Sequence, residues 1–287
     1  GESGSGKTMT ALAVMGLLPG PAAMVSRGTI TFQGREIQSL PERGYRRLRG
    51  SQMSMIFQDP MSSLNPVHTV GRQIAEMFFR HKRLGRRSAR NAAVRLMERV
   101  RIPDAAQRAK QHPHQFSGGM RQRVMIAMAL ALDPALLIAD EPTTALDVTV
   151  QSQILGLLRD IQQAERTAVL FISHDLGVVA SIASQVAVMY AGRVVESGPV
   201  QQVYDAPAHP YTRSLLRSAP VLDGSQTELE AIGGAPPTVT SVPSGCPFHP
   251  RCPMARDLCR TTMPERRTIR PGQQAACHYS EELAGVT

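Results

Sequence analysis

The first eight residues of the chain, GESGSGKT, have the composition and spacing of a loop that binds phosphate. They fit the pattern G-x-x-x-x-G-K-[ST], and residues 10–18 then have the composition of a helix. Glycines let successive backbone N–H groups turn toward a β-phosphate, Lys7 adds a positive charge, and Thr8 offers its hydroxyl to Mg²⁺. A flexible Gly/Ser linker is the alternative, but a linker does not require Gly-Lys-Thr at this offset. The predicted nucleotide contacts of the loop are Gly1, Ser3, Gly4, Gly6, Lys7 and Thr8.

A second group of reactive residues follows an apolar stretch near the middle of the chain. The sequence LLIADE, residues 136–141, predicts a buried strand that ends in two acids. Asp140 would hold Mg²⁺ through water, and Glu141 would polarise the water that attacks a γ-phosphate. Two acids after a strand are weak evidence alone, because helix N-termini also favour Asp and Glu. Together with the loop at residues 1–8, they indicate a site for nucleotide hydrolysis.

The elements that must position these residues follow from the periodicity of the apolar side chains. Alternation and short apolar runs predict strands, a 3.6-residue period predicts helices, and a helix between two apolar strands gives a β-α-β unit. The result is an α/β core interrupted by a helical insertion. The predicted strands are residues 28–33, 52–57, 135–139, 168–172, 186–190 and 193–196, the last two as a hairpin, and the predicted helices are residues 70–83, 88–101, 118–132 and 150–165.

Composition limits the classes of protein to which the chain can belong. Its 287 residues, 42% of them apolar, are enough for one large domain or two modest ones. The longest apolar runs, such as residues 124–132, are too short to span a bilayer. The formal net charge is +9, with a local concentration in residues 80–95. Arginines at helical spacing without interleaved aromatics favour a solvated helix face over a nucleic-acid site.

The stretch QFSGGMRQRV, residues 115–124, contains a second helix start that suits an anion. Ser117 occupies the position of a helix N-cap, and Gly118 and Gly119 let an anion approach the first exposed N–H groups. An ordinary N-cap is the alternative. With the phosphate loop and the two acids, however, the sequence resembles the ATP-binding subunits of ABC transporters nearly from end to end. The resemblance implies a P-loop NTPase fold with a RecA-like α/β core, an antiparallel β part and an inserted α-helical subdomain.

Further motifs of that family occur in the family order. The signature is usually Leu-Ser-Gly-Gly-Gln, so Phe116 and Met120 depart from it outside the Ser-Gly-Gly core. The resemblance implies that Gln58 contacts Mg²⁺ and senses the transmembrane partner, that Asp147 belongs to the D-loop, and that His174 reaches the γ-phosphate. The structural alternatives are a polar residue at a strand end, a helix cap and a surface turn, respectively. The predicted catalytic residues are Glu141, His174 and Gln58.

The same resemblance implies a cofactor, partners and a location. Two cassettes pair head to tail, so that the phosphate loop of one faces the signature of the other with ATP between them. The expected partners are a second ATP-binding subunit, usually a different chain, two transmembrane permeases and, indirectly, an extracytoplasmic substrate-binding protein. The expected location is peripheral, at the cytoplasmic face of the plasma membrane. Beyond the loop, the predicted nucleotide contacts are Gln58, Ser117, Gly118, Gly119, Asp140 and Asp147, and the predicted Mg²⁺ ligands are Thr8, Gln58 and Asp140.

Two segments favour one branch of the family. Residues 209–216, HPYTRSLL, and residues 61–66, MSSLNP, resemble segments of the oligopeptide and dipeptide importers. The chain is therefore interpreted as the ATPase subunit of a peptide importer, with a nickel chelate or glutathione as alternative cargoes. A soluble ABC ATPase acting on nucleic acid or ribosomes would carry a coiled-coil or zinc insertion or a second cassette. The sequence contains none of these, so no nucleic-acid partner is expected, and its intact catalytic residues argue against an inert subunit.

All four cysteines follow a segment rich in Gly, Pro, Ser and Thr, residues 223–245, which is predicted to be a linker. Clustered thiols in a cytosolic protein suggest a metal or cluster site rather than disulfides. Loops of this length weaken the case for zinc, whereas a [4Fe–4S] cluster takes four thiolates, and the resemblance suggests such a cluster in related ATPases. Zinc and free structural thiols stay open as alternatives. The four cysteines are Cys246, Cys252, Cys259 and Cys277, with the spacing C-x5-C-x6-C-x17-C.

These patterns predict two domains. Residues 1–205 are expected to form the ABC ATPase domain, with its helical subdomain at about residues 65–134, and residues 206–287 a C-terminal extension that carries the cysteines. In the family, a buried strand leads into the first glycine of the loop, and an aromatic residue before it stacks on adenine. Neither lies within this sequence, which is therefore interpreted as truncated at its N-terminus. We expect the chain as given to bind ATP poorly.

Overall fold

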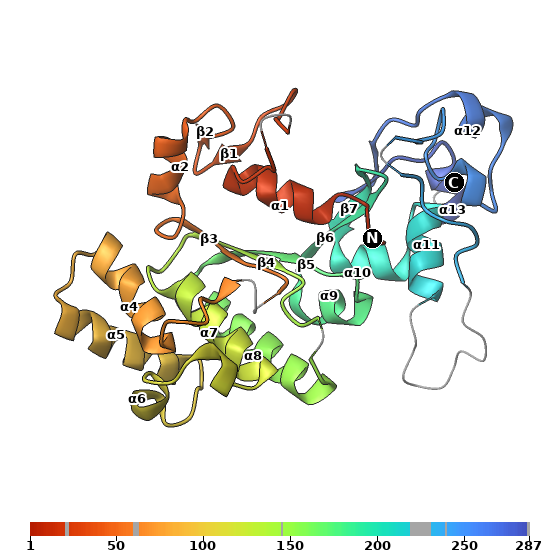
Figure 1. Cartoon of the computed structure of the whole chain (residues 1–287). Coiled ribbons are helices and arrows are strands. Elements are labelled where there is room, and N and C mark those ends of the chain that lie inside the picture. The colour runs from red at the N-terminus through yellow and green to blue at the C-terminus, as the bar shows by residue number, and fades with distance from the viewer. Residues whose placement is uncertain (21–22, 60–62, 145, 219–230, 239, 286–287) are drawn as a thin grey trace. The chain divides into compact units, whose positions relative to one another are not determined.

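The chain folds into two compact units, each with its own sheet (Figure 1). The computed structural model describes residues 1–20, 23–59, 63–144, 146–218, 231–238 and 240–285. The central unit is Thr8–Ile172, and the terminal unit combines Gly1–Lys7 with Ser173–Thr287. The predicted α/β class with parallel and antiparallel parts is confirmed. The predicted domain limits at residues 205 and 206 follow motifs rather than packing, and they stay a prediction.

The central unit is built on a three-stranded parallel sheet in the order β3-β4-β5. The short strands predicted at these positions are confirmed. β4 is almost completely buried, which explains why its sequence is an apolar run without polar alternation. The helix α8 connects β4 to β5 and completes the predicted β-α-β unit. The bounds are Met53–Ile56 for β3, Leu136–Asp140 for β4, Val148–Glu165 for α8 and Ala168–Ile172 for β5.

The connection between β3 and β4 contains the predicted helical insertion. Its helices bury an apolar face, whereas the arginines of residues 80–95 are exposed to solvent, as a solvated face requires. The three predicted helices are confirmed, with ends shifted by less than one turn. The bounds are Val70–His81 for α4, Arg86–Arg99 for α5, Ala105–Arg108 for α6, Pro113–Gln115 for η1 and Gly118–Leu130 for α7.

The N-terminal part of the central unit differs from the prediction in two places. The helix α1, Lys7–Met15, begins at the lysine of the phosphate loop rather than at Thr10, and its Ala11 packs in an apolar cluster with Met53 and Ile138. The strand predicted at 28–33 is only a two-residue arm, because Gln33 and Gly34 have positive φ values and turn the chain back at once. The bounds are Thr31–Phe32 for β1, Arg35–Glu36 for β2 and Glu42–Leu48 for α2.

The terminal unit is built on an antiparallel sheet in the order β6-β7-β9-β8. The predicted hairpin of β6 and β7 is confirmed, with Ala191 and Gly192 at positive φ in its turn. The strands β8 and β9 and the helices α9, α12 and α13 were not predicted, and β9 pairs with β7. The bounds are Leu176–Ile182 for α9, Gln185–Tyr190 for β6, Arg193–Pro199 for β7, Val200–Asp205 for α10, Pro210–Arg217 for α11, His249–Arg251 for η2, Asp257–Thr261 for α12, Arg267–Arg270 for β8, Gln273–Ala275 for β9 and Ser280–Ala284 for α13.

Candidate nucleotide site and cysteine pocket

Four predicted site residues meet at the carboxyl edge of the parallel sheet. Thr8 Oγ1 donates a hydrogen bond to Asp140 Oδ1 at 3.2 Å, and Gln58 Nε2 donates to Glu141 Oε2 at 3.1 Å. Because β3 and β4 are parallel and in register, the second residue after β3 lies level with the first after β4. The sheet therefore brings together residues 83 positions apart in the sequence. We call Thr8, Gln58, Asp140 and Glu141 the strand-end group.

The two acids of the strand-end group have different surroundings. Asp140 is 2% exposed, and its oxygen lies beside the Thr8 hydroxyl, a pair of oxygen donors that fits the Mg²⁺ shell predicted there. Glu141 is partly exposed and has a left-handed φ of +48°. Its N–H donates to Ile172 O at 2.9 Å, and its carboxylate also accepts a bond from Thr144 Oγ1 at 3.1 Å. These bonds hold Glu141 in a conformation that a non-glycine residue seldom adopts.

The signature and the D-loop lie against each other in the central unit. Ser117 caps α7 by accepting a bond from Met120 N at 3.3 Å, and Asp147 caps α8 by accepting from Val150 N at 2.9 Å. A Cβ on Gly119 would lie 2.5 Å from Val150 Cγ1, so a glycine is required at this crossing. Ser117 and Gly118 are exposed, which leaves the start of α7 open to an anion. Residues 61–62 of the predicted MSSLNP segment and Ala145 of the D-loop lie outside the described residues.

The phosphate loop packs on the β6-β7 hairpin within the terminal unit. Gly4 and Gly6 have φ values of +78° and +96°, which glycine adopts without strain. Gly192 N donates to Ser5 O at 3.1 Å, and a Cβ on Gly1 would lie only 2.1 Å from the carbonyl oxygen of Met189. The first and last glycines of the motif are therefore needed for packing and for the turn.

The side chain of Lys7 is folded over the phosphate loop. Lys7 Nζ donates to Gly1 O at 2.7 Å and to Glu2 O at 3.0 Å, and Ser5 Oγ donates to Glu2 O at 2.7 Å. The carbonyl oxygen of Glu2 thus accepts bonds from both Ser5 and Lys7. The sequence did not predict this role, because the motif leaves the position of Glu2 unspecified. His174 is exposed between β5 and α9, and its role at the γ-phosphate stays a prediction.

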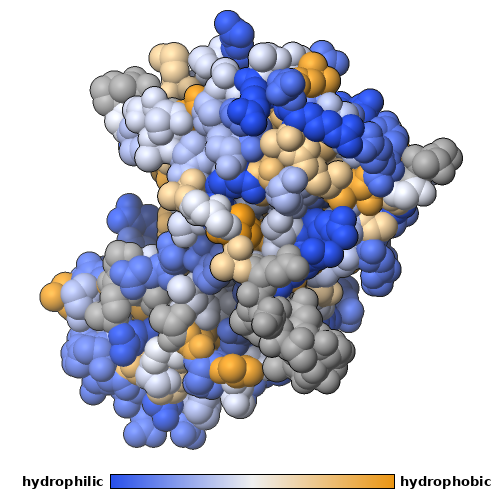
Figure 2. Space-filling view, turned by 90° about the vertical axis from the view of Figure 1, so that its right-hand side faces the viewer, coloured by the Kyte–Doolittle hydropathy of each residue, from blue (hydrophilic) through white to orange (hydrophobic). Residues whose placement is uncertain are grey.

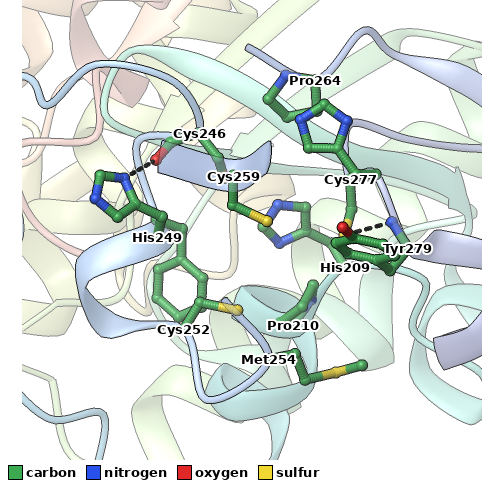
Figure 3. Close-up of a pocket in the computed structure, with 12 residues that line it drawn as sticks. His209, Pro210, Cys246, His249, Cys252, Met254, Cys259, Pro264, Cys277 and Tyr279 are labelled. Carbon is green, nitrogen blue, oxygen red and sulfur yellow. Dashed lines mark hydrogen bonds between the residues drawn. The ribbon is translucent and has the colours of Figure 1, made fainter. Parts of the chain in front are cut away.

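The four cysteines line one small pocket of the terminal unit (Figure 3). All four are free thiols, two of them buried. Cys246 N donates to Cys259 O at 2.8 Å, which ties two of their segments together, and Tyr279 N donates to Cys277 Sγ at 3.4 Å within the segment of Cys277. Other lining residues are His209, Phe248, Met254 and Tyr279.

Burial disfavours the thiolate form of three of these cysteines. Burial raises the pKa of Cys246 and Cys277, and it raises the pKa of Cys252 to about 11. Four thiols around one space fit the donor set of a four-thiolate cluster. Among the described residues, no three His, Cys, Asp or Glu side chains are grouped closely enough to hold one metal ion.

The hydropathy of the surface and the lengths of the helices bear on membrane insertion. The face in Figure 2 is mostly hydrophilic, with scattered hydrophobic residues. Within the described part of the chain, no helix is both long and apolar enough to cross a bilayer.

Comparisons with known proteins agree with the motifs. The profile of the ABC transporter family matches residues 1–144, and that of the oligopeptide/dipeptide transporter C-terminal region matches residues 195–259. The chain is 52% identical to the oligopeptide transport ATP-binding protein OppD of Salmonella typhimurium, over 96% of this chain and 82% of that protein. It is 50% identical to the dipeptide transport ATP-binding protein DppD of Bacillus subtilis, over 99% of this chain and 85% of that protein.

Solved structures show the same fold. The post-hydrolysis dimer of the ATP-binding cassette MJ0796 with ADP and Pi has a TM-score of 0.61 at 24% identity, over 69% of this chain and 82% of that chain. The cbiO1 protein of Clostridium perfringens, part of the cbiONQ ABC transporter complex, has a TM-score of 0.61 at 28% identity, over 71% and 77%. The chain belongs to the ABC transporter ATP-binding proteins, in the oligopeptide/dipeptide transporter family.

Proposed function

We propose that the chain hydrolyses ATP at the strand-end group and the phosphate loop, and that this hydrolysis drives the uptake of di- or oligopeptides. The chain is an ABC-type ATPase subunit of an oligopeptide/dipeptide import system. The observation that best supports the catalytic assignment is the meeting of Thr8, Asp140, Gln58 and Glu141 at one sheet edge.

Each residue of this site has a distinct role in the proposed reaction. Thr8 and Asp140, with Gln58, would hold the Mg²⁺ shell, and a bound Mg²⁺ would supply positive charge against the phosphates. Glu141 accepts the proton of the attacking water, a role worth about 10²–10⁴ in rate for a positioned base. Lys7 and His174 stabilise the charge on the transferred phosphoryl group. These roles rest on positioning and charge, which dominate phosphoryl transfer.

The second half of the nucleotide site is proposed to come from a partner cassette. The exposed start of α7, capped by Ser117, suits the γ-phosphate of ATP held by the phosphate loop of another copy or a second ATPase subunit. The complex would also contain two permeases, with a binding protein outside the membrane, and the chain would lie at the cytoplasmic face. Nickel chelates and glutathione are the alternative cargoes.

Replacing Glu141 by Gln tests this function in the assembled transporter. We expect the Glu141→Gln variant to retain ATP binding and cassette pairing while ATP hydrolysis and peptide uptake both fall about a hundredfold or more. Asp160→Asn, which changes an exposed acid on α8, is the matched control. Hydrolysis near the wild-type rate in Glu141→Gln would remove Glu141 from the role of base. Uptake of labelled dipeptides, oligopeptides, glutathione and a nickel chelate separates the cargoes.

We also propose that the cysteine pocket binds a [4Fe–4S] cluster. The proposal is supported by the common pocket of the four thiols, which is the donor set that such a cluster takes. The proposed cluster ligands are Cys246, Cys252, Cys259 and Cys277. Anaerobic purification should give a brown protein with about four iron atoms per chain. Zinc, or no metal at all, in such a preparation would refute the cluster.

A further inference from the structure

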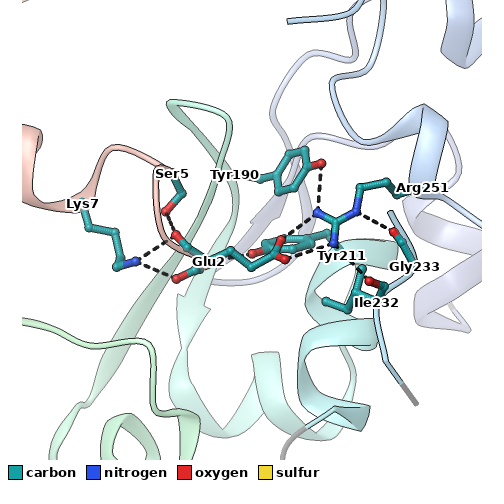
Figure 4. A network of polar contacts seen from close by, with 9 residues as sticks. Glu2, Ser5, Lys7, Tyr190, Tyr211, Ile232, Gly233 and Arg251 are labelled. Carbon is teal, nitrogen blue, oxygen red and sulfur yellow. Dashed lines mark hydrogen bonds and ion pairs between the residues drawn. The ribbon is translucent and has the colours of Figure 1, made fainter. Parts of the chain in front are cut away.

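Arg251 comes from the cysteine-bearing part of the chain, yet it contacts the phosphate loop (Figure 4). It lies in the loop between Cys246 and Cys252, at the end of η2. Its Nη1 donates to Glu2 Oε2 at 2.8 Å, and its Nη2 donates to Glu2 Oε1 at 3.0 Å. This two-pronged pairing fixes direction as well as distance, which a single contact does not. The pair joins residues 249 positions apart within the terminal unit.

The guanidinium of Arg251 is held on every side. The Arg251 side chain is only 5% exposed, and its Nε donates to Gly233 O at 2.8 Å. Its Nη2 also donates to Ile232 O at 3.3 Å, and its Nη1 donates to Tyr190 Oη at 3.3 Å. The Glu2 partner raises the pKa of Arg251 further, so the charge is permanent. An ion pair whose arginine is buried and makes these extra bonds has little freedom to move.

Glu2 is fixed at its main chain as well as at its carboxylate. Its N–H donates to Tyr211 Oη at 2.8 Å, and Tyr211 is fully buried against Tyr190 and Phe248. Its carbonyl oxygen accepts the bonds from Ser5 Oγ and Lys7 Nζ. A continuous series of contacts therefore leads from Arg251 through Glu2 to the lysine of the phosphate loop.

We propose that Arg251 is a positioning residue for the phosphate loop. By holding Glu2, it sets the loop conformation in which Lys7 and the loop N–H groups meet the phosphates of ATP. The cysteine-bearing segment thereby becomes part of the structural support of the nucleotide site. Arg251 itself does not touch the nucleotide in this role. The competing explanation is that Arg251 only anchors residues 232–233 to the terminal unit.

The test compares Glu2→Gln and Arg251→Met in the assembled transporter. Both variants lose the contact between Arg251 and Glu2, so in each we expect the ATP KM and the Kd for Mg·ATP to rise about tenfold. We expect kcat to stay within about twofold of wild type, because binding is lost equally in the ground state and the transition state. Arg251→Lys keeps the charge but not the two-pronged geometry, so an intermediate effect is expected. Arg256→Met is the matched control, because Arg256 makes a similar pair with Glu282 at 2.7 and 3.2 Å and is half exposed.

A double-mutant cycle distinguishes the two explanations. If Arg251 acts through Glu2, Arg251→Met weakens ATP binding less than about twofold when Glu2→Gln is already present. Additive effects in the cycle would overturn the proposal, and so would an unchanged ATP KM in Glu2→Gln. If Arg251→Met fails to fold, Arg251→Lys takes its place in the cycle. The inference rests on the proposed nucleotide role of the loop, which Lys7→Ala tests separately. Unchanged ATP binding in Lys7→Ala would overturn that role itself.

Discussion

The strand-end group of the central unit and the cysteine pocket of the terminal unit are positioned by different kinds of structure. The strand-end group follows directly from two parallel strands in register, so backbone hydrogen bonds set its spacing. The cysteines lie on loops and one-turn helices, which are tied by single bonds such as that from Cys246 N to Cys259 O. Backbone hydrogen bonds between paired strands position the strand-end group, whereas a few individual contacts position the cysteine pocket.

The two sites also differ in their electrostatics. The strand-end group gathers oxygen atoms that suit Mg²⁺, and the hydroxyl of Thr8 and the amide of Gln58 donate bonds to its carboxylates. In the cysteine pocket, burial raises the thiol pKa of Cys246, Cys252 and Cys277. The strand-end group thus suits a hydrated cation. The cysteine pocket favours neutral thiols, which a metal would have to deprotonate in order to bind.

The largest effect is expected in the strand-end group. Asp140→Ala should lower kcat for ATP hydrolysis about a hundredfold or more, because a buried oxygen donor for the Mg²⁺ shell is lost. Steady-state hydrolysis at saturating Mg²⁺ measures it. Asp160→Asn should stay within about twofold of wild type, since that acid is exposed. A wild-type rate in Asp140→Ala would reduce Asp140 to a structural residue of the strand end.

The cysteine pocket should be sensitive to one glycine. Gly245 has a φ of +66°, and a Cβ there would lie 2.4 Å from Cys259 O, so Gly245→Ala forces backbone atoms apart. We expect a loss of about 1–3 kcal/mol of unfolding free energy, which urea unfolding measures. Gly233→Ala, with no atom within 4 Å of the new Cβ, is the control. Equal stability of the two variants would contradict the idea that single contacts position the pocket.

A smaller effect is expected where the signature crosses the start of α8. Gly119→Ala would place its Cβ 2.5 Å from Val150 Cγ1, whereas Gly118→Ala would place its Cβ 3.7 Å from Leu146. Overpacking at Gly119 should cost about 1–2 kcal/mol, and a second substitution, Val150→Ala, should recover part of it. Thermal unfolding of the single and double variants measures this. Absence of recovery would show that the clash with Val150 is not the cause.

The smallest effect concerns pH and a buried acid of the terminal unit. Burial raises the pKa of Glu196, whose carboxylate accepts bonds from Ala208 N and His209 N at 2.7 and 3.0 Å. Because the folded pKa lies above the unfolded value, the stability from Glu196 is present below the ordinary pKa of 4.5 and is lost as pH rises through the folded pKa.

The Glu196→Gln variant isolates that contribution. Relative to wild type, it should gain stability as pH rises from about 4 to 7, by less than about 1.4 kcal/mol per pH unit. Urea midpoints across this range measure the difference. The surface variant Glu281→Gln is the control in the same unit. A gain in the opposite direction would mean that the bonds to Glu196 outweigh its burial.

The sequence predicted correctly where residues that follow a regular element would lie. Gln58 and Asp140 follow or end apolar strands, and parallel strands place such residues at one edge. Prediction failed for β8 and β9, because strands of four and three residues carry little periodic signal. The pairing of Glu2 with Arg251 was also missed, since no local pattern relates positions so far apart.

The sequence by itself determined the phosphate loop, the strand that ends in two acids, the signature and the family. Those features depend on residue type and short spacing, which physical chemistry constrains locally. Only the tertiary structure decided that β9 joins β7, that the four cysteines share one pocket, and that Arg251 supports Glu2. The reason is physical: these contacts exist only after distant segments pack together, and their free energy comes from burial and from bonds that the extended chain does not make.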